Sequence, residues 1–313
     1  MSVAIAYTEF GGPEVLRQID IPTPVPGPGE VVVRVEAAGV NPIDAKLRSG
    51  RRPSGEITEP RRVGSDGAGV VAAVGADVDG FRVGEPVAFS GATGAYATEV
   101  LLPAGRVHPR PPGVTAADGA ALGIPVGTAY QTLRSLSVGA GDTLLVHAGS
   151  GSVGQALIQY AVLWGATVLA TSSERRFDRV RALGATPIVY GDGLLDRVRA
   201  AAPQGVTVAI DAAGTDEALQ TSIEVVADRT RVATLVRGKD AAGWGIRAFS
   251  GGAPVPLTAQ QLAWRDEAVP VTLALLAAGR FSLELGPIFP LADAADAHRV
   301  VESGVDGKVT LVP

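Results

Sequence analysis

The stretch Thr143-Leu144-Leu145-Val146-His147-Ala148-Gly149-Ser150-Gly151-Ser152-Val153-Gly154 decides the fold. Its first half is an apolar run typical of a buried strand, and its second half fits G-x-G-x-x-G before a helix expected to run through Trp164. Glycines let the backbone turn sharply and approach a pyrophosphate, whose charge then faces the free N–H groups of the helix N-terminus. Residues 149–154 are therefore predicted to bind a dinucleotide. The alternative is a tight β–α turn that binds nothing.

After about residue 120 the chain alternates between short apolar runs and helical patterns. Further strands are expected at 168–171, 188–190, 206–212 and 231–236, and further helices at 174–183, 194–202 and 217–226. Strands that alternate with helices in this way predict a parallel, doubly wound sheet. The fold class is therefore α/β.

Residues 1–110 follow a different pattern, in which short β-segments are broken by glycine and proline. Strands are expected at 30–35, 69–75 and 83–89, and residues 51–62 read as an exposed polar loop. Many short strands at this spacing predict a barrel or a sandwich. Towards the C-terminus we expect a helix over 258–278, interrupted at Pro270, and a final strand at 307–312.

Length and composition limit the possible function classes. The 313 residues suggest two domains, and the 46% of hydrophobic residues are enough for sizeable cores. A net charge of −5 and a pI near 5.3 argue against nucleic acid or an anionic membrane as a partner. No apolar run reaches the roughly 18 residues of a membrane span. The start, Met1-Ser2-Val3-Ala4-Ile5, lacks the basic residues of a signal peptide, so the expected location is the cytoplasm.

The residue types also limit the chemistry. The chain has no cysteine, which excludes disulfides, iron–sulfur clusters, thiolate catalysis and Cys-ligated zinc. Its three histidines, His108, His147 and His298, match no local ligand spacing, so no metal site is predicted. None of the five tyrosines has a lysine four residues later. An activated Tyr–Lys pair, which can remove the proton of an alcohol, is therefore not predicted either.

The cofactor type depends on the end of the second expected strand. An NAD site usually has Asp or Glu there to bind the ribose hydroxyls. This chain has Thr171-Ser172-Ser173, then Glu174, then Arg175-Arg176. Small hydroxyl side chains leave room for a 2′-phosphate, and guanidinium groups can bind it through paired hydrogen bonds. These residues favour NADP(H) over NAD, with Glu174 as the main argument against. The alternative is that the arginines only form the solvated face of a surface helix.

Several further motifs resemble those of the zinc-independent medium-chain dehydrogenase/reductases, specifically the NADPH:quinone oxidoreductase branch that includes zeta-crystallin. The shared motifs are Ala38-Gly39-Val40-Asn41-Pro42-Ile43-Asp44, Gly64-Ser65-Asp66-Gly67-Ala68-Gly69-Val70-Val71, Gly127-Thr128-Ala129-Tyr130, and Ala294 to His298 with Glu302 and Gly307-Lys308-Val309. They run in family order over nearly the whole chain. Zinc-dependent relatives carry Cys in place of Asn41 and G-H-E in place of Gly64-Ser65-Asp66. One departure is Ser152, where the family usually has glycine.

The resemblance implies a two-domain organisation. A GroES-like β-barrel catalytic domain would comprise residues 1–121 and 259–313, and a Rossmann NADP-binding domain would comprise residues 122–258. Nicotinamide and substrate would bind in the cleft between the domains. The resemblance also implies a homodimer, often formed through edge strands of the nucleotide domains. The segment that contains Phe249 and Ser250 is expected to form either that contact or a loop at the nicotinamide.

Three more residues are expected near the cofactor through the resemblance. Thr128 would lie at the domain junction. Tyr190, at the end of the third strand of the cofactor domain, would lie near the adenosine, with sheet packing as the alternative. Lys308 matches a family lysine that faces the cofactor cleft, with a surface strand position as the alternative.

Three residues are predicted on the substrate side. The amide of Asn41 could orient a carbonyl or the nicotinamide ribose, unless Asn41-Pro42 is only a turn. Asp44 could bind the ribose or relay a proton, or it could cap a helix. Tyr130 could donate a proton, or it could be a packed aromatic residue.

These residues favour an acceptor that takes hydride readily. Quinones and conjugated enones give a resonance-stabilised phenolate or enolate, so neutral hydrogen-bond donors and a proton from water can suffice. The predicted function is metal-free transfer of hydride from NADPH to a quinone or a related conjugated carbonyl. The alternatives are an enone or enoyl-thioester reductase, and a non-catalytic NADPH-binding protein.

Overall fold

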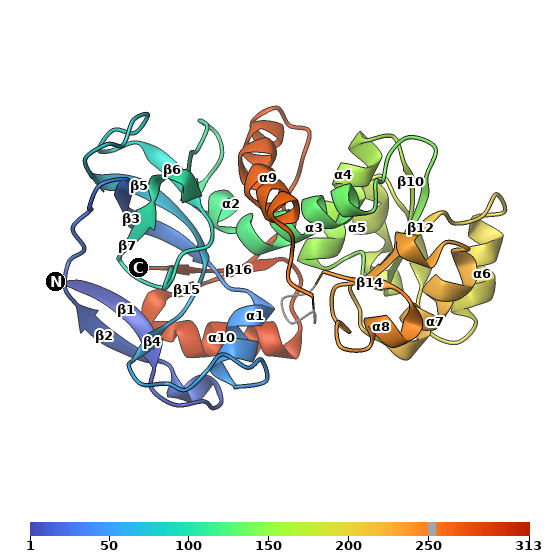
Figure 1. Cartoon of the computed structure of the whole chain (residues 1–313), viewed down its shortest axis with the longest axis horizontal. Helices are drawn as coiled ribbons and strands as arrows, with labels where there is room; N and C mark the ends of the chain where they lie inside the picture. The colour runs from blue at the N-terminus through green and yellow to red at the C-terminus, as the bar shows by residue number, and fades with distance from the viewer. Residues whose placement is uncertain (250–254) are drawn as a thin grey trace. The chain divides into compact units, whose positions relative to one another are not determined.

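The computed structural model describes residues 1–249 and 255–313 (Figure 1). These residues divide into two compact units, Met1–Ile124 with Val269–Pro313, and Pro125–Ala268. The second boundary falls inside one helix, α9 (Ala259–Ala277). The predicted interruption at Pro270 was wrong, because the helix continues through it. Ala268, Val269 and Leu273 around the proline are buried, and this packing offsets the backbone hydrogen bond that proline cannot donate.

The first unit is built mainly on antiparallel strands. Its larger sheet has the order β15-β16-β3-β5-β6-β8, with β7 also paired to β3, and its smaller sheet has the order β2-β1-β4. The strands are β1 (Ser2–Tyr7), β2 (Arg17–Ile21), β3 (Glu30–Gly39), β4 (Arg61–Arg62), β5 (Asp66–Val74), β6 (Pro86–Phe89), β7 (Glu99–Pro103), β8 (Val107–Pro109), β15 (Leu285–Pro290) and β16 (Lys308–Val312). The helices are α1 (Pro42–Arg48), α2 (Ala116–Ala120) and α10 (Ala294–Ser303).

Strand β3 is the centre of this unit because it pairs with β5, β7 and β16. Its consecutive valines, Val31, Val32 and Val33, are all buried, as expected for a strand covered on both faces. Gly69 of β5 lies so close to β3 that a Cβ atom there would stand 1.9 Å from the carbonyl oxygen of Arg34. The glycines in the first unit therefore allow close strand contact as well as turns.

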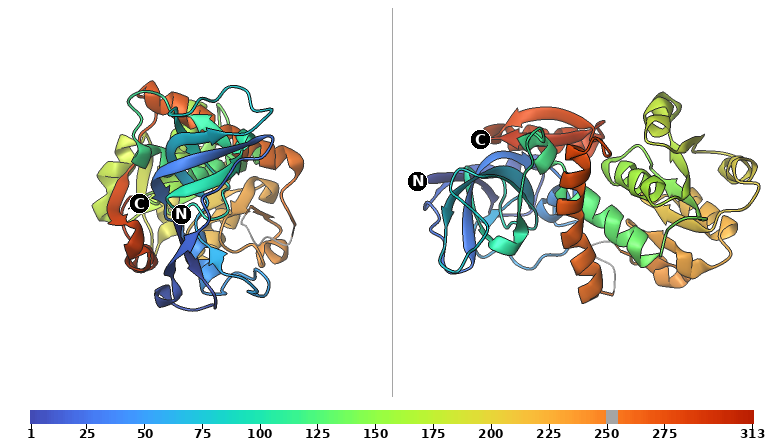
Figure 2. Two further views of the ribbon diagram at one scale, coloured as in Figure 1. Left: turned by 90° about the vertical axis from the view of Figure 1, so that its left-hand side faces the viewer. Right: turned by 90° about the horizontal axis from the view of Figure 1, so that it is seen from above.

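The second unit is a six-stranded parallel sheet with helices on both faces (Figure 2). The strand order is β11-β10-β9-β12-β13-β14, and every pair is parallel. The strands are β9 (Thr143–His147), β10 (Thr167–Ser172), β11 (Thr186–Val189), β12 (Val208–Asp211), β13 (Val232–Thr234) and β14 (Arg247–Ala248). The other helices are α3 (Gly123–Ser135), α4 (Ser152–Leu163), α5 (Phe177–Ala182), α6 (Leu194–Ala201), α7 (Asp216–Val225) and α8 (Ala241–Trp244).

The order of these strands places a potential binding site. The chain moves outward from β9 through β10 to β11, then returns to the other side of β9 to form β12. Right-handed crossovers in opposite directions put helices on opposite faces, which accounts for the two helical layers. Ligands of such sheets bind beyond the carboxyl ends of the strands where the order reverses. In this unit that point lies between β9 and β12.

No helix in the described part of the chain is long and apolar enough to cross a membrane.

The predicted helix at 174–183 begins later than expected, because residues Glu174–Arg176 form a short 3₁₀ turn before α5. Hydroxyl and charged side chains in this segment favour such a local turn over a regular first helical turn.

Four helices of the second unit end in the same hydrogen-bonded turn, with one residue in the left-handed conformation. Gly165 (φ 87°) follows α4, Gly184 (φ 93°) follows α5 and Gly245 (φ 68°) follows α8, but Ser137 (φ 51°) takes this position after α3. In each case the next residue donates its N–H to a carbonyl five residues earlier, with N–O distances of 3.0 to 3.2 Å. A serine side chain is strained in this conformation and glycine is not.

We therefore expect Ser137→Gly to raise the free energy of unfolding by about 1 kcal/mol. Chemical denaturation measures the change. The matched variant Gly165→Ser should lose a similar amount, because it places the same side chain in the same left-handed position after α4. Equal stability of all three proteins would contradict this account of the helix ends.

Candidate functional site

The glycine-rich turn lies between β9 and α4, where the sequence predicted it. A Cβ atom at Gly149 would stand 2.6 Å from the Cβ of Ala170, and one at Gly154 would stand 2.2 Å from the carbonyl oxygen of Ala148. These two glycines are required by packing. Gly151 differs, because the nearest atom to its Cβ would be the Ala148 oxygen at 3.5 Å, an ordinary contact distance. Packing within the turn therefore leaves Gly151 unexplained, and close approach of a ligand would explain it.

Hydrogen bonds hold this turn in place. The N–H groups of Ala148 and Gly149 donate to Thr171, at 3.1 Å to Oγ1 and 2.8 Å to the carbonyl oxygen. The side-chain amide of Gln155 donates to the carbonyl oxygen of Ser150 at 2.8 Å. Gly151 and Ser152 at the tip are exposed, and α4 begins at Ser152. The first N–H groups of a helix have no partner within the helix, so a fixed turn presents them together to an anion.

The arginines predicted to select the cofactor follow β10, the neighbour of β9. Because β9 and β10 are neighbouring parallel strands, the arginine segment after β10 and the glycine turn after β9 lie at the same edge of the sheet. Ser172 is buried and donates to the carbonyl oxygen of Ser173 at 3.2 Å, so its hydroxyl is used within the chain. Arg175 is exposed and Arg176 is half-buried, both within the 3₁₀ turn. The segment thus presents cationic groups beyond the strand end.

Arg179 is a residue that sequence reasoning placed only on a surface helix. Its Nε donates to Oε1 of Gln155 at 2.8 Å, which ties α5 to the start of α4. Gln155 is the same residue that holds Ser150, so one amide connects the glycine turn with the arginine helix. The sequence did contain a signal for Arg179: it follows Arg176 by three residues, and this spacing puts both side chains on one side of a helix.

The other predicted cofactor residues have mixed surroundings. Tyr190 follows β11 and is 57% exposed, so it does not pack into the sheet, and Thr128 is half-buried in α3. Phe249 is buried, with its N–H on the carbonyl oxygen of Thr234 and the Arg247 guanidinium 4.8 Å above its ring. Ser250 lies outside the described residues.

Two buried residues at the carboxyl edge were not predicted as part of the site. Asp211, at the end of β12, accepts hydrogen bonds from the N–H groups of Ala213 and Gly214 at 2.9 and 2.7 Å and from the hydroxyl of Thr234 at 2.7 Å. It thereby fixes the loops after β12 and β13. His147, at the end of β9, lies 3.4 Å from the Thr171 hydroxyl, and burial lowers its pKa to about 4. His147 is therefore neutral near pH 7.

The first unit contains a separate buried polar cluster around Asn41, which caps the start of α1. The Asn41 amide nitrogen donates to Oδ2 of Asp66 at 2.8 Å, and its oxygen accepts from the ammonium of Lys308. Asp66 also accepts from the backbone N–H of Ile124 at 2.8 Å. Lys308 is only 5% exposed, so it is not a surface lysine. The side-chain amide of Asn41 thus binds the buried Lys308 ammonium through its oxygen and the buried Asp66 carboxylate through its nitrogen.

Asp44 belongs to the same cluster. One of its carboxylate oxygens accepts from the N–H of Asn41 and from the hydroxyl of Tyr96, both at 2.9 Å. Burial is the largest influence on its pKa, which rises to about 6, with Asp66 adding to the rise and Lys308 opposing it. Burial also lowers the pKa of Lys308, although Asp66 and Asp44 oppose that shift. The hydrogen bond from the backbone N–H of Asn41 shows that the Asp44 carboxylate also stabilises the start of α1.

Tyr130, the third residue predicted on the substrate side, packs inside the second unit. Its ring contacts Tyr160 and Trp164 edge-on, with 5.3 Å between ring centres in both cases. Its hydroxyl donates to Glu267 at 3.0 Å, and burial raises its pKa. These contacts match the alternative in which Tyr130 is a packed aromatic residue.

Comparisons with known proteins agree with this geometry. Residues 27–112 match the family described as "Alcohol dehydrogenase GroES-like domain", and residues 152–242 match "Zinc-binding dehydrogenase". A quinone oxidoreductase of Pseudomonas aeruginosa is 32% identical over 100% of both chains, and that of Sus scrofa is 31% identical over 99% of this chain and 97% of its own. The solved structure of mycobacterial Rv1454c complexed with NADPH is 31% identical, covers 100% of both chains and has a TM-score of 0.83.

Other matches are higher in identity but shorter. The quinone oxidoreductase of Homo sapiens is 39% identical over 56% of this chain, and the matched part of this chain spans 54% of that relative. The chain therefore matches only about half of the length of such relatives.

A GroES-like unit combined with a Rossmann unit defines a medium-chain dehydrogenase/reductase. Within this class, the chain belongs to the zinc-independent quinone oxidoreductase family, whose members are oxidoreductase enzymes. By the resemblance given in the sequence analysis, Asn41 and Ser65 stand where zinc-dependent relatives have the metal-binding Cys and His. Over residues 1–249 and 255–313, no group of three or more His, Cys, Asp or Glu side chains is placed to hold a metal ion.

The tightly packed Gly154 and the open Gly151 should respond differently to substitution, the first in stability and the second in nucleotide binding. Gly154→Ala should lower the free energy of unfolding by about 2 kcal/mol, because its methyl group overlaps the Ala148 carbonyl. Gly151→Ala should change stability by less than about 0.5 kcal/mol and weaken dinucleotide binding about tenfold, because its methyl group stands where the pyrophosphate is expected. Denaturation and nucleotide titration measure the two effects. Unchanged nucleotide affinity in a folded Gly151→Ala protein would contradict the binding role.

Proposed function

We propose that the protein transfers hydride from NADPH to a quinone or a related conjugated carbonyl, without a metal ion. The observation that carries the proposal is the shared sheet edge, where the open glycine turn and the Arg175–Arg176 segment lie after neighbouring strands. Guanidinium groups suit a 2′-phosphate, and a glycine turn suits a pyrophosphate. The printed names of full-length relatives, together with a related structure that contains NADPH, support the same assignment.

The second unit would hold the cofactor. The turn Gly149–Gly154 would accept the pyrophosphate against the free N–H groups of α4. Arg175 and Arg176 would bind the 2′-phosphate, while Arg179 steadies Gln155 and through it the turn. When bound, NADPH supplies the hydride. These residues of the chain orient the cofactor and neutralise the charge of its phosphates.

The cluster in the first unit would serve the acceptor. A quinone that receives a hydride becomes a phenolate, and it becomes the hydroquinone when one oxygen gains a proton. A positive charge near that oxygen favours the transition state, in which negative charge develops. Lys308 provides such a charge, and Asn41 and Asp66 hold it in the buried cluster. We assign the positioning of this cation to Asn41, which Asp66 and Asp44 hold in turn.

Two further properties belong to the proposal. We propose a homodimer, supported by the family resemblance and by the position of the short strand β14 at one end of the parallel sheet. We also propose a cytoplasmic location, as expected from the sequence.

The test is oxidation of NADPH, followed by its absorbance, with a benzoquinone, a phenanthrenequinone and a 2-alkenal as acceptors. We expect EDTA-resistant turnover of the quinones and slower turnover with NADH. Turnover of the alkenal alone would replace the quinone with an enone as the acceptor. Tight NADPH binding without turnover of any acceptor would favour a non-catalytic binding protein, and failure to bind either nucleotide would overturn the proposal.

Cofactor selection can be tested separately. Replacing Arg175 and Arg176 together with alanine should raise KM for NADPH about 10- to 100-fold and leave KM for NADH nearly unchanged, because only NADPH carries the 2′-phosphate. Arg181→Ala is the matched control. Arg181 lies on α5, directly after the 3₁₀ turn that contains Arg175 and Arg176. It is exposed and pairs with Asp178, so its loss should change neither KM. Equal effects on both nucleotides would show that the arginine pair has a structural role instead.

A further inference from the structure

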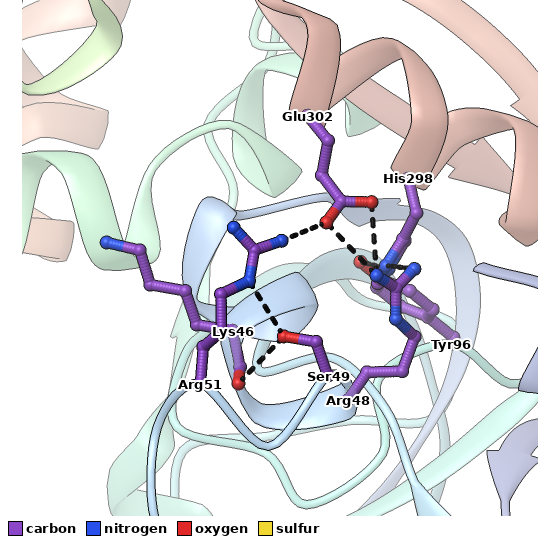
Figure 3. Close-up of polar contacts among 7 residues, drawn as sticks. All are labelled: Lys46, Arg48, Ser49, Arg51, Tyr96, His298 and Glu302. Carbon is purple, nitrogen blue, oxygen red and sulfur yellow. Dashed lines mark hydrogen bonds and ion pairs between the residues drawn. The ribbon is translucent and has the colours of Figure 1, made fainter. Parts of the chain in front are cut away.

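A chain of buried side chains joins helices α1 and α10 within the first unit (Figure 3). Nη1 of Arg48 lies 3.4 Å from Nδ1 of His298, and Nε2 of His298 lies 3.3 Å from the hydroxyl of Tyr96. The Tyr96 hydroxyl donates to Asp44 at 2.9 Å. Asp44 and Arg48 are four residues apart on α1, so this row of hydrogen bonds begins at one turn of the helix and ends at the neighbouring turn. All four residues are buried.

The two ends of this chain fix its direction. An arginine can only donate hydrogen bonds, and an ionised carboxylate can only accept them. His298 must therefore accept from Arg48 at Nδ1 and donate from Nε2 to the oxygen of Tyr96. Tyr96 in turn donates to Asp44. The opposite direction would need protons on Asp44 and on Nδ1 of His298, and the second would face an N–H of Arg48. One tautomer of His298 satisfies every contact.

The surroundings keep the middle of the chain from changing its protonation. Burial, with Arg48 adding to it, lowers the pKa of His298 to about 3, and burial raises the pKa of Tyr96 well above its usual value. His298 is therefore neutral near pH 7, and Tyr96 keeps its proton. The chain is a fixed row of dipoles that points from Arg48 to Asp44.

The Arg48 end is anchored at the surface. Nη2 of Arg48 donates to both oxygens of Glu302, at 3.1 Å each, and Glu302 also accepts from Arg51 at 2.7 Å. Glu302 lies one turn after His298 on α10. A positive charge that is only 1% exposed needs such a partner, because an unpaired buried charge is strongly unfavourable. The ion pair therefore holds Arg48 in the position that orients His298.

The Asp44 end reaches the predicted substrate side. Asp44 accepts from the N–H of Asn41, whose side chain holds Lys308. We propose that Arg48 is a positioning residue: through a one-way hydrogen-bond chain of His298 and Tyr96 it orients the Asp44 carboxylate, which holds Asn41 and Lys308 for the reaction. The tautomer of His298 follows from the contacts alone, whereas the effect on turnover rests on the proposed function.

The charged and titratable groups around Asp44 come from three elements besides α1 and from one loop. Those that act on Asp44 directly are Asp66 of β5, Lys308 of β16 and Tyr96 in the loop before β7. His298 of α10 and Arg48 of α1 lie behind Tyr96 in the row of hydrogen bonds. Loss of Arg48 would remove the donor that forbids a proton on Nδ1 of His298. The reverse direction of the chain, with a protonated Asp44, would then become accessible. The pH dependence of the reaction should therefore respond to Arg48.

The first readout is nitrogen-15 NMR of the three histidines in the whole protein near pH 6, with His298→Gln to assign the signals. In the unchanged protein, Nε2 of His298 should carry the proton. Arg48→Gln should populate the Nδ1–H form and move the acid limb of kcat/KM upward by about one pH unit, which lowers kcat/KM about tenfold within that limb. Arg48→Lys, which still donates, should restore both properties. The Kd for NADPH should stay unchanged in each variant.

Arg51→Ala is the matched control. Arg51 also binds Glu302 and is 66% exposed, but it has no contact with His298 in the described structure, so both readouts should stay as in the unchanged protein. If Arg48→Gln does not fold, Glu302→Gln provides the same test with Arg48 present but weakly anchored. A proton on Nδ1 of His298 in the unchanged protein would overturn the proposal. So would an Arg48 variant that behaves like Arg51→Ala. An absence of quinone turnover would instead refute the proposed function, while the tautomer measurement would still be decisive for the chain.

Discussion

The second unit depends on the close approach of Gly154 to the carbonyl oxygen of Ala148. A Cβ atom at residue 154 would stand 2.2 Å from that oxygen, so only glycine lets α4 begin directly over the end of β9. This contact sets the helix N-terminus at the point where the strand order reverses. Thr171 of the next strand and Gln155 of the helix then hold the turn. A single steric constraint thus places the free N–H groups where a phosphate can reach them.

The first unit is subject to a different constraint, the burial of charge. Lys308, Asp66, Asp44 and Arg48 are all nearly inaccessible, and a buried charge is tolerated only with partners. Asn41 links Lys308 to Asp66, and Tyr96 with His298 links Asp44 to Arg48. Such a network requires a defined position for every member, because one missing partner leaves a charge uncompensated. We infer that the unit keeps these charges for their geometry, since apolar residues would pack at lower cost.

Sequence reasoning worked best where structure is local. The alternation of strands and helices and the glycine turn follow from neighbouring residues, and both lie where they were expected. It failed where distant parts of the chain meet. Lys308 and Asn41 are 267 residues apart, so no pattern could show that the lysine is buried against that amide. Packing on both sides of Pro270 kept α9 continuous, which a local helix rule could not anticipate. The contacts of Tyr130 with Tyr160, Trp164 and Glu267 likewise could not be read from a local pattern.

For the proposed function, the charge of the buried cluster favours one class of acceptor. Zinc stabilises the oxygen of an alkoxide strongly enough to support alcohol chemistry, because it carries two charges and binds oxygen directly. Here the positive group is a single ammonium whose charge is partly balanced by Asp44 and Asp66. Its field is weaker, so the product anion must already be stable by itself. Phenolates and enolates spread their charge over several atoms and meet this condition, whereas alkoxides do not. The proposed preference for conjugated acceptors therefore rests on the single, partly balanced positive charge of Lys308.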